Sequence, residues 1–194
     1  MGQPKASLPI GRSGDTFLSR IITTLVTAEL PEVIVVTGAA PEATRAAWPQ
    51  RDARVHFIEN AEWQSGQLSS LLTGLNAPSV VPIEAALVTL VDIPLVTVAT
   101  VKALVRTWRE TRAPLVRPAR STPQANEEHG HPVIFDASLF AALRAADPAT
   151  GAKPVVRAYA REIVNLPITD AGAFLDIDTP DAYAQLLGEA EPLR

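Results

Sequence analysis

The sequence predicts a three-layer α/β fold in which a mostly parallel sheet carries helices on both of its faces. Two observations predict it. Short apolar runs alternate with stretches of helical periodicity along the chain, an order typical of parallel strands joined by helical crossovers. In addition, residues 85–91 form an almost continuous apolar run, as expected of a central strand covered on both faces. Since 194 residues suit one domain, we expect residues 1–194 to form a single domain.

The predicted strands are short runs rich in aliphatic residues. They lie at residues 33–36, 55–58, 85–91, 115–116, 132–135, 163–168 and 174–177. Between two of them, residues 119–130 combine Ser, Thr, Pro and Asn with two Glu, which predicts a mobile loop.

Helices are predicted where apolar residues recur at helical spacing, as they do in residues 17–26 and 98–108. Either Asp15 or Thr16 can cap the first of these helices, and Thr97 can cap the second.

A further helix is predicted near the C-terminus. Thr179 is a good N-cap, Pro180 suits the first turn, and Asp181 suits the positive end of the helix. The inward-facing residues are predicted to be Tyr183, Leu186 and Leu187, and Gly188 is predicted to end the helix.

The composition excludes several classes of protein. The formal net charge is −4 and the basic residues are scattered, so the sequence offers no basic face for a nucleic acid. The absence of cysteine excludes disulfides, Cys-ligated zinc and thiol catalysis. No apolar stretch is long enough to span a bilayer, and the first residues include no apolar signal region. We therefore expect a cytoplasmic protein with neither a membrane nor a nucleic-acid partner.

Asp92 is the first candidate site residue, because ligands of open α/β sheets bind outside the carboxyl ends of the strands. It directly follows the predicted strand at residues 85–91. A carboxylate in this place is suited to hold Mg²⁺, which prefers oxygen ligands. The alternative is an aspartate that caps the turn before Ile93 and Pro94.

Asp176 and Asp178 form the second candidate. Residues two apart on a strand share a face, so both carboxylates would point the same way, about 7 Å apart. Like charges held together are unfavourable unless a cation or hydrogen-bond donors compensate them. A metal ion is one answer, and exposure to solvent at the strand end is the other.

The third candidate is the segment at residues 63–71, in which Gly66 allows close backbone approach. Ser69 and Ser70 add hydroxyl groups at a predicted helix start. Such a segment can cradle a nucleoside or a phosphate. The alternative is an ordinary capped helix after a turn.

Lys5 and His131 are weaker candidates. A lysine near a chain terminus is usually a solvated charge, and Lys5 matters only if a phosphate lies beside it. The pair His129 and His131 has no third ligand of its kind nearby, which argues against zinc. His131, next to a predicted strand, suits a substrate-contacting donor or a structural histidine.

Taken together, these motifs resemble the MobA-like NTP transferase domain, and especially its molybdenum cofactor cytidylyltransferases. Residues 1–5 match the end of the family's opening loop, L-x-x-G-x-S-x-R-M-G-x-x-K. Four further segments match in order. They are residues 66–71 for the base-binding G-x-x-S-S-L, residues 91–94 for G-D-x-P with Val91 in place of Gly, residues 130–132 for G-H-P, and residues 175–183 for the closing L-D-I-D-T-P-E-D-Y.

The resemblance implies a Rossmann-like fold of the GT-A type and a role for each candidate residue. Asp92 and Asp178 would be ligands of Mg²⁺, with Asp176 in reserve. Lys5 would neutralise phosphate charge, and His131 would contact the substrate. The nucleotide would be bound by Lys5, Gly66, Gln67, Ser69 and Ser70.

The family's L-x-x-G-x-S-x-R segment is absent from the sequence. In the family this segment forms the first, central strand and the glycine-rich loop that holds the triphosphate. We therefore expect the first strand to be missing, which would leave a slot in the sheet and unpaired backbone groups on both neighbours. Two explanations stay open: a true start upstream of Met1, which we favour, or a degenerate paralogue.

By resemblance, the expected function is nucleotidyl transfer from an NTP to a phosphorylated acceptor, with release of pyrophosphate. CTP is the favoured nucleotide over GTP, and a molybdopterin-type cofactor is the expected acceptor. Lys5 and Asp92 would carry the catalysis. The alternatives are a nucleotide- or cofactor-binding paralogue without turnover, and a sugar-nucleotide transferase with another acceptor.

Overall fold

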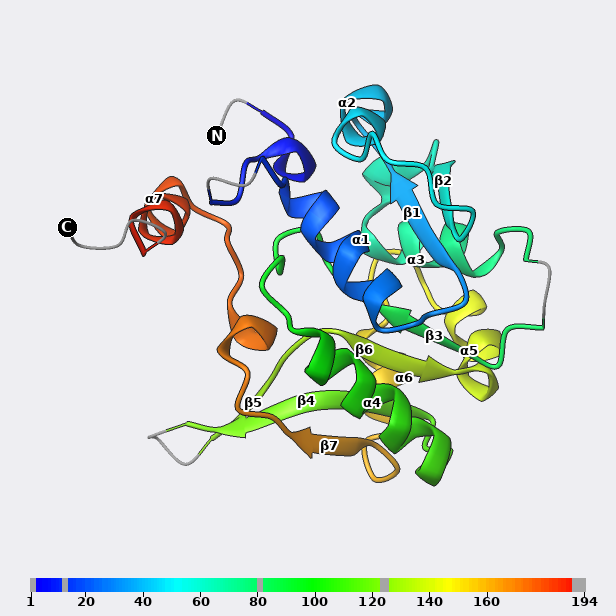
Figure 1. The fold of residues 1–194 in the computed structure, drawn as a ribbon. Helices are drawn as coiled ribbons and strands as arrows, with labels where there is room; N and C mark the ends of the chain where they lie inside the picture. Colours follow the sequence, from blue (N-terminus) through cyan, green and yellow to red (C-terminus); the bar gives the residue numbers. More distant parts are fainter. Residues whose placement is uncertain (1–2, 12–13, 80–81, 123–125, 190–194) are drawn as a thin grey trace.

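The computed structural model describes residues 3–11, 14–79, 82–122 and 126–189 (Figure 1). Its strands form two sheets. A two-stranded sheet pairs β1 (Val33–Thr37) with β2 (Val55–Glu59) in parallel, and a five-stranded sheet has the order β3-β6-β4-β5, with β7 also paired to β4. The strands of the larger sheet are β3 (Ala85–Val88), β4 (Leu115–Ser121), β5 (Glu127–His129), β6 (Val133–Asp136) and β7 (Val164–Pro167).

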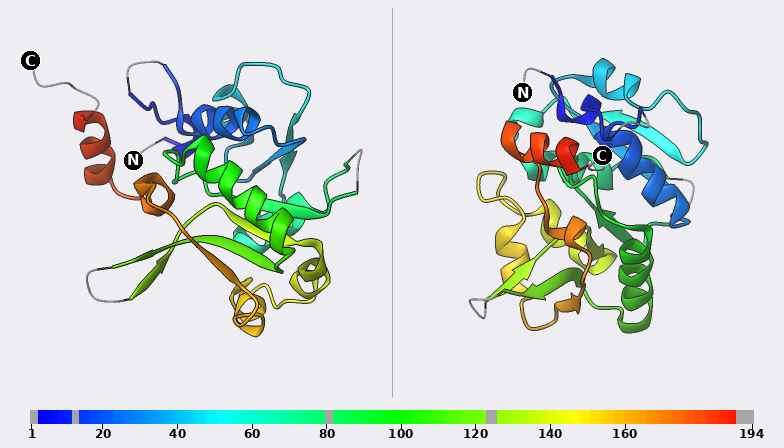
Figure 2. Two further views of the ribbon diagram at one scale, coloured as in Figure 1. Left: turned by 60° about the horizontal axis from the view of Figure 1, so that its bottom comes forward. Right: turned by 60° about the vertical axis from the view of Figure 1, so that its left-hand side comes forward.

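Helices cover both faces of these sheets (Figures 1 and 2). On one face, α1 (Phe17–Thr27) packs beside α4 (Val98–Thr111). On the other lie α3 (Gln67–Leu75), α5 (Phe140–Arg144) and α6 (Lys153–Ala158). The three-layer α/β prediction is therefore confirmed. The remaining helical elements are η1 (Lys5–Ser7), α2 (Pro41–Ala46), η2 (Trp63–Ser65), η3 (Ala137–Leu139), η4 (Ala171–Phe174) and α7 (Pro180–Glu189).

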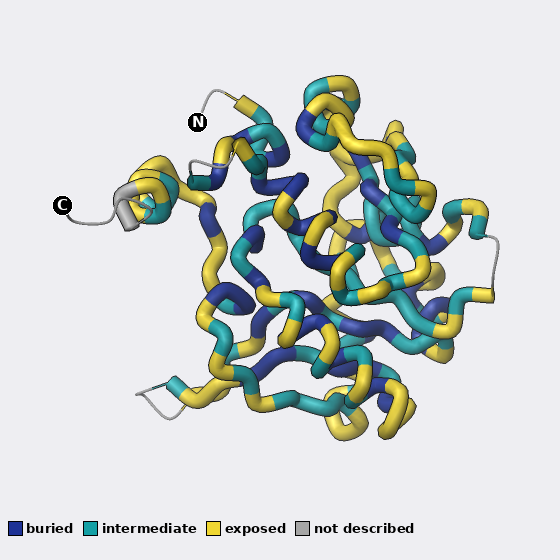
Figure 3. The backbone as a smooth tube through the Cα atoms, viewed as in Figure 1, coloured by how far each residue is buried: buried dark blue, intermediate teal, exposed yellow. Residues whose placement is uncertain are grey.

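The buried core follows the apolar periodicity of these elements, and Figure 3 shows its residues as dark stretches that alternate with more exposed ones along the helices and strands. Thr16, rather than Asp15, caps α1: its hydroxyl accepts from the amide of Ser19 at 3.1 Å. Thr97 caps α4 as predicted, accepting from the amide of Thr100 at 3.3 Å. None of the described helices is long and apolar enough to cross a membrane.

The larger sheet is mixed rather than mostly parallel. β6 lies between β3 and β4 and runs antiparallel to both. β4 and β5 form an antiparallel hairpin, while β4 and β7 are parallel. The predicted loop at residues 119–130 thus lies largely within this hairpin, although residues 123–125 are outside the described part. Alternation of strands and helices predicted the layers but not the direction of each strand.

β1 and β3 occupy the same layer without pairing to each other. Val33, Val35 and Leu87 all pack into one apolar cluster with α1. Among the described residues, no strand is hydrogen-bonded to both β1 and β3. β3 ends at Val88, earlier than the predicted run at residues 85–91, and its residues are only half-buried. The expected full burial of a central strand is therefore not observed.

The segment that leads to α7 also differs from the prediction. Residues 174–177 do not form a strand, because η4 ends at Phe174 and no neighbouring strand pairs with the residues that follow. Thr179 caps α7 as expected, accepting from the amide of Ala182 at 3.1 Å. Tyr183 and Leu186 pack inward, whereas Leu187 is exposed. The helix continues to Glu189 and is not ended by Gly188.

Candidate active site

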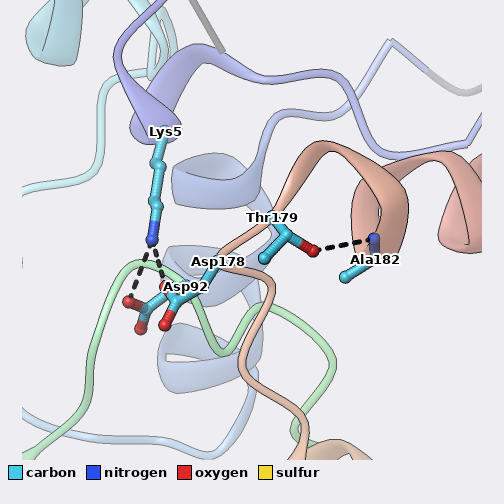
Figure 4. Close-up of polar contacts among 5 residues, drawn as sticks. All are labelled: Lys5, Asp92, Asp178, Thr179 and Ala182. Carbon is cyan, nitrogen blue, oxygen red and sulfur yellow. Dashed lines mark hydrogen bonds and ion pairs between the residues drawn. The ribbon is translucent and has the colours of Figure 1, made fainter.

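Three charged side chains from distant parts of the sequence meet beyond the end of β3 (Figure 4). The ammonium of Lys5 donates to Oδ2 of Asp92 at 3.3 Å and also to Oδ1 of Asp178. Lys5 comes from η1, Asp92 from the turn after β3, and Asp178 from the segment before α7. The structure therefore brings together three of the residues that the sequence singled out.

Buried neighbours hold these side chains in place. Ile93 and Ile177, each next to a site aspartate, are only 1% exposed. The amide of Ile177 donates to the carbonyl of Asp92 at 2.9 Å, which joins the two acidic segments directly. Ile177 points into the core while Asp176 and Asp178 are exposed, so the two carboxylates lie on the side opposite Ile177.

The charges of the site shift one another's proton affinity. Burial lowers the pKa of Lys5, but the hydrogen bonds and negative charges of Asp178 and Asp92 outweigh it and raise that pKa above its usual value. The hydrogen bond from Lys5 in turn lowers the pKa of Asp178. Burial, followed by the negative charges of Asp92 and Asp178, raises the pKa of Asp176. The site therefore carries more negative charge than Lys5 alone compensates.

One carboxylate oxygen of the site has no partner. Oδ1 of Asp92 is buried and accepts no hydrogen bond, although Oδ2 is paired with Lys5. An unpaired buried oxygen is costly, and a cation beside it would remove that cost. Within the described residues, no group of three or more His, Cys, Asp or Glu side chains forms a preassembled metal site. Protein ligands to a cation here would thus be few.

His131 lies beside this group of charges. Its peptide bond to Pro132 is cis, and its amide donates to the carbonyl of Ala173 at 2.8 Å. Burial lowers the pKa of the imidazole, which the backbone of Val88 and the charges of Asp176 and Asp92 only partly offset. A neutral imidazole in this position can donate or accept one hydrogen bond.

The predicted nucleotide segment forms the start of α3. Gly66 precedes the helix with φ of 101°, in the region that favours glycine, and space is open around its Cα. Gln67 is exposed in the first turn. Ser69 donates its hydroxyl to the carbonyl of Gly66 at 2.8 Å, so this proton is already used within the protein. Within the described part of the chain, the hydroxyl of Ser70 has a single hydrogen bond, which it accepts from Asn60 at 3.0 Å.

Asn60 organises this segment and was missed by the sequence analysis. Its buried amide donates to the hydroxyls of Ser69 and Ser70, at 2.9 and 3.0 Å, and its Oδ1 accepts from the amide of Glu62. It directly follows β2, so the strand-end rule could have found it. A pocket of about 480 Å³ opens beside it between β2 and α3, and its lining includes Asn60, Glu62, Ser69, Thr73 and Asn76.

The carboxylate group and the start of α3 remain two separate features. Among the described residues, no hydrogen bond or ion pair joins Gly66, Ser69 or Ser70 to the group of Lys5, Asp92 and Asp178. Met1 and Gly2 of the first motif lie outside the described residues.

Comparison with known proteins decides the family. The sequence pattern of the MobA-like NTP transferase domain matches residues 1–163. The chain belongs to the MobA-like NTP transferase family. It is accordingly a nucleotidyltransferase with an NTP and an acceptor as its substrates.

Individual relatives of this MobA-like protein cover nearly all of its length. Nicotine blue oxidoreductase of Paenarthrobacter nicotinovorans is 29% identical over 185 residues, which are 95% of this chain and 88% of that protein. The structure of Rv0371c from Mycobacterium tuberculosis in complex with manganese is 25% identical, with a TM-score of 0.74 over 96% of this chain and 93% of that one.

A third relative shows the same fold at lower sequence identity. It is 2-C-methyl-D-erythritol 4-phosphate cytidylyltransferase from Thermus thermophilus, which is 20% identical to the MobA-like chain. Its TM-score is 0.69 over 97% of this chain and 94% of that one.

Proposed function

We propose that this chain transfers a nucleotidyl group from an NTP, with CTP favoured, to a phosphorylated acceptor such as a molybdopterin cofactor, and releases pyrophosphate. One observation carries the proposal: Asp92 and Asp178 converge on a single cation, the ammonium of Lys5, while Oδ1 of Asp92 is buried without a partner. Family membership supports the reaction class.

The donor set suits Mg²⁺. This ion keeps several waters and is usually bound by one or two carboxylates together with substrate phosphates. Asp92 and Asp178 would hold it, and the absence of a preassembled three-ligand group among the described residues fits such a shared site. When bound, the ion supplies Lewis-acid stabilisation of the phosphoryl oxygens. The manganese complex of Rv0371c supports a divalent ion in this fold.

Lys5 would serve two partners in turn. Without substrate its ammonium neutralises Asp92 and Asp178. With a divalent ion held by Asp92 and Asp178, the ammonium of Lys5 would be free to turn to the phosphates, where its positive charge would offset the negative charge of the transition state. The side chain of Lys5 is 30% exposed, which leaves its ammonium open to solvent on one side.

The remaining candidates would orient the two substrates. Gly66 leaves room for close approach of a nucleotide, and Gln67 and Ser70 present polar groups beside it, while Ser69 fixes the backbone of the turn. His131 lies next to Asp92 and Asp176 and would contact the acceptor. Catalysis would rest on positioning and electrostatics rather than on a covalent intermediate.

The test is release of pyrophosphate from CTP, GTP, ATP and UTP with Mg²⁺ or Mn²⁺ and a panel of phosphorylated acceptors that includes molybdopterin and sugar phosphates. Turnover with CTP and molybdopterin supports the proposal. Turnover only with a sugar phosphate would show that a sugar phosphate, and not molybdopterin, is the acceptor. Nucleotide binding without pyrophosphate release overturns it. A parallel assay with reduced nicotinamide cofactors is included because one relative is named an oxidoreductase.

Replacing Lys5 by Gln is expected to move metal affinity and catalysis in opposite directions. Without the competing ammonium, Mn²⁺ binds about threefold more tightly, the size of a partly exposed ion pair. Because the phosphates lose their counter-charge, kcat falls about a hundredfold. Isothermal titration with Mn²⁺ and steady-state rates measure the two effects. The control is Lys102→Gln, which breaks a pair with Glu29 on the surface of α4 and leaves both values unchanged. Weaker Mn²⁺ binding in Lys5→Gln would contradict the proposed exchange.

A further inference from the structure

The segment at residues 168–179, here called the strap, carries Asp176 and Asp178 from β7 to α7 (Figure 1). After Ile168, whose amide donates to the carbonyl of Ala119 at 3.0 Å, the strap contains only the short η4 and no strand, so no sheet ladder fixes the rest of its path. The position of Asp178 relative to Asp92 therefore depends on a small number of contacts between the strap and the rest of the molecule.

The largest set of these contacts is made by Asp170, a half-buried residue at the start of the strap. Its Oδ2 accepts from the amide and hydroxyl of Thr97 at 2.9 and 2.8 Å, and from the hydroxyl of Thr100 at 2.7 Å. Its Oδ1 accepts from the amide of Gly172 at 3.0 Å. The carboxylate sits at the N-terminus of α4, where the helix dipole favours negative charge.

Thr97 begins the helix that follows Asp92, so Asp170 joins the strap to the same short connection that carries Asp92. Close backbone packing continues the attachment. A Cβ added to Gly172 would lie 2.2 Å from the carbonyl oxygen of Leu95, which leaves no room between the strap and this connection. Further along, the amide of Ile177 donates to the carbonyl of Asp92 at 2.9 Å.

We propose that Asp170 is a positioning residue that sets the separation of the Asp92 and Asp178 carboxylates by fastening the strap to the start of α4. The inference deepens the proposed function, on which its metal readout rests. Asp170 touches neither Asp92 nor Asp178, and acts through Thr97, Thr100 and the backbone of the strap. Loss of the hydrogen bonds between Asp170 and the start of α4 lets Asp178 move away from Asp92 and weakens the binding of a shared divalent ion.

The fastening also carries a pH dependence of stability. Burial raises the pKa of Asp170, but the hydrogen bonds from Thr100, Thr97 and Gly172 outweigh it and hold the native pKa below its usual value. A lowered native pKa gives stability that is complete above the pKa of the unfolded chain and is lost as the pH falls through the native value. We expect the difference in unfolding free energy between the wild type and Asp170→Asn to shrink as the pH falls from about 7 to about 3, measured by urea unfolding. A constant difference would contradict this assignment.

The test of the positioning role compares Asp170→Asn with Asp136→Asn. Asp136 is a matched control, because it also caps a helical turn and accepts from two donors, the amide of Ser138 at 2.9 Å and Nε1 of Trp108 at 3.0 Å, but it does not touch the strap. Titration with Mn²⁺ should show about tenfold weaker binding in Asp170→Asn and wild-type binding in Asp136→Asn. Thr100→Val should repeat part of the loss, and Thr100→Ser, which keeps the hydroxyl, should restore binding.

Hydrogen exchange of backbone amides separates this inference from the proposed function, since it needs no metal. In Asp170→Asn the amides of Ile177 and Gly172 should exchange faster than in the wild type. In Asp136→Asn the amide of Ser138 should exchange faster, and those of Ile177 and Gly172 should not. If the wild type binds no Mn²⁺ but Ile177 responds as expected, the metal site fails and the fastening stands. If the Ile177 amide and Mn²⁺ binding are both unchanged in a folded Asp170→Asn, the positioning role is overturned.

Discussion

Replacing Asp92 by Asn is expected to lower the rate of nucleotidyl transfer about a thousandfold and to abolish measurable binding of Mn²⁺. Asp92 provides both the contact to Lys5 and the buried oxygen without a partner. The amide has nearly the same shape as the carboxylate but carries no charge, and half of it cannot accept a bond to a cation. The effect therefore falls on the chemistry rather than on folding. Rates of pyrophosphate release and Mn²⁺ titration measure it.

The control for this prediction is Asp147→Asn. Asp147 is an exposed aspartate that accepts from the amide of Ala149 in a turn far along the chain. The substitution Asp147→Asn removes one negative charge, as Asp92→Asn does, and should leave both the rate of pyrophosphate release and Mn²⁺ binding at wild-type values. A rate within tenfold of the wild type in Asp92→Asn, with intact folding, would remove Asp92 from the proposed chemistry.

Replacing Gly130 by Ala is expected to lower both the free energy of unfolding and the affinity for Mn²⁺. The added Cβ would lie 2.2 Å from the carbonyl oxygen of Ala173, the atom that accepts from the amide of His131. Backbone atoms cannot move aside as a flexible side chain can, so the strap must shift. We expect the free energy of unfolding to fall by about 3 kcal/mol. Urea unfolding measures the loss, and Mn²⁺ affinity should fall with it because Asp178 lies on the displaced strap.

Gly74→Ala is the matched control. Gly74 lies within α3, and an added Cβ meets only Cγ2 of Val36 at 3.4 Å, an ordinary contact distance. Since alanine is the better helix former, this variant should be as stable as the wild type or more so. If Gly130→Ala unfolds at the same urea concentration as Gly74→Ala, the strap is not fixed where the structure places it.

The sequence could predict much of the fold because its apolar runs are local signals. The runs at residues 33–36 and 55–58 became β1 and β2, and residues 17–26 became α1. Such local signals fail where the formation of a strand depends on a second strand that can pair with it. Residues 175–178 alternate apolar and acidic side chains, a pattern typical of a strand, and Ile177 is indeed buried. No described strand lies beside this segment to pair with it, however, so no strand forms.

In the candidate site, too, some residues could be predicted from local sequence and others depend on contacts between distant parts of the chain. Asp92 stood out because it ends an apolar run, Asp178 because it shares a predicted strand face with Asp176, and the family resemblance linked Asp92 to Asp178. Asp170 gave no such signal. Its partners Thr97 and Thr100 lie 73 and 70 residues away, and only the folded chain brings them together. Contacts that position a site are harder to find in a sequence than the groups that they position.

The lack of hydrogen bonds between β1 and β3 has a consequence for how binding at the two ends of the site is coupled. Within the described residues, no strand ladder joins the sheet of β1 and β2 to the sheet that contains β3, and apolar side chains of β1, β3 and α1 pack together between them. Such contacts tolerate small sliding, whereas a ladder of directional bonds resists it. A nucleotide bound at the start of α3, as we propose, would be brought closer to Asp92 by a small shear between the two sheets, without the loss of a strand pair.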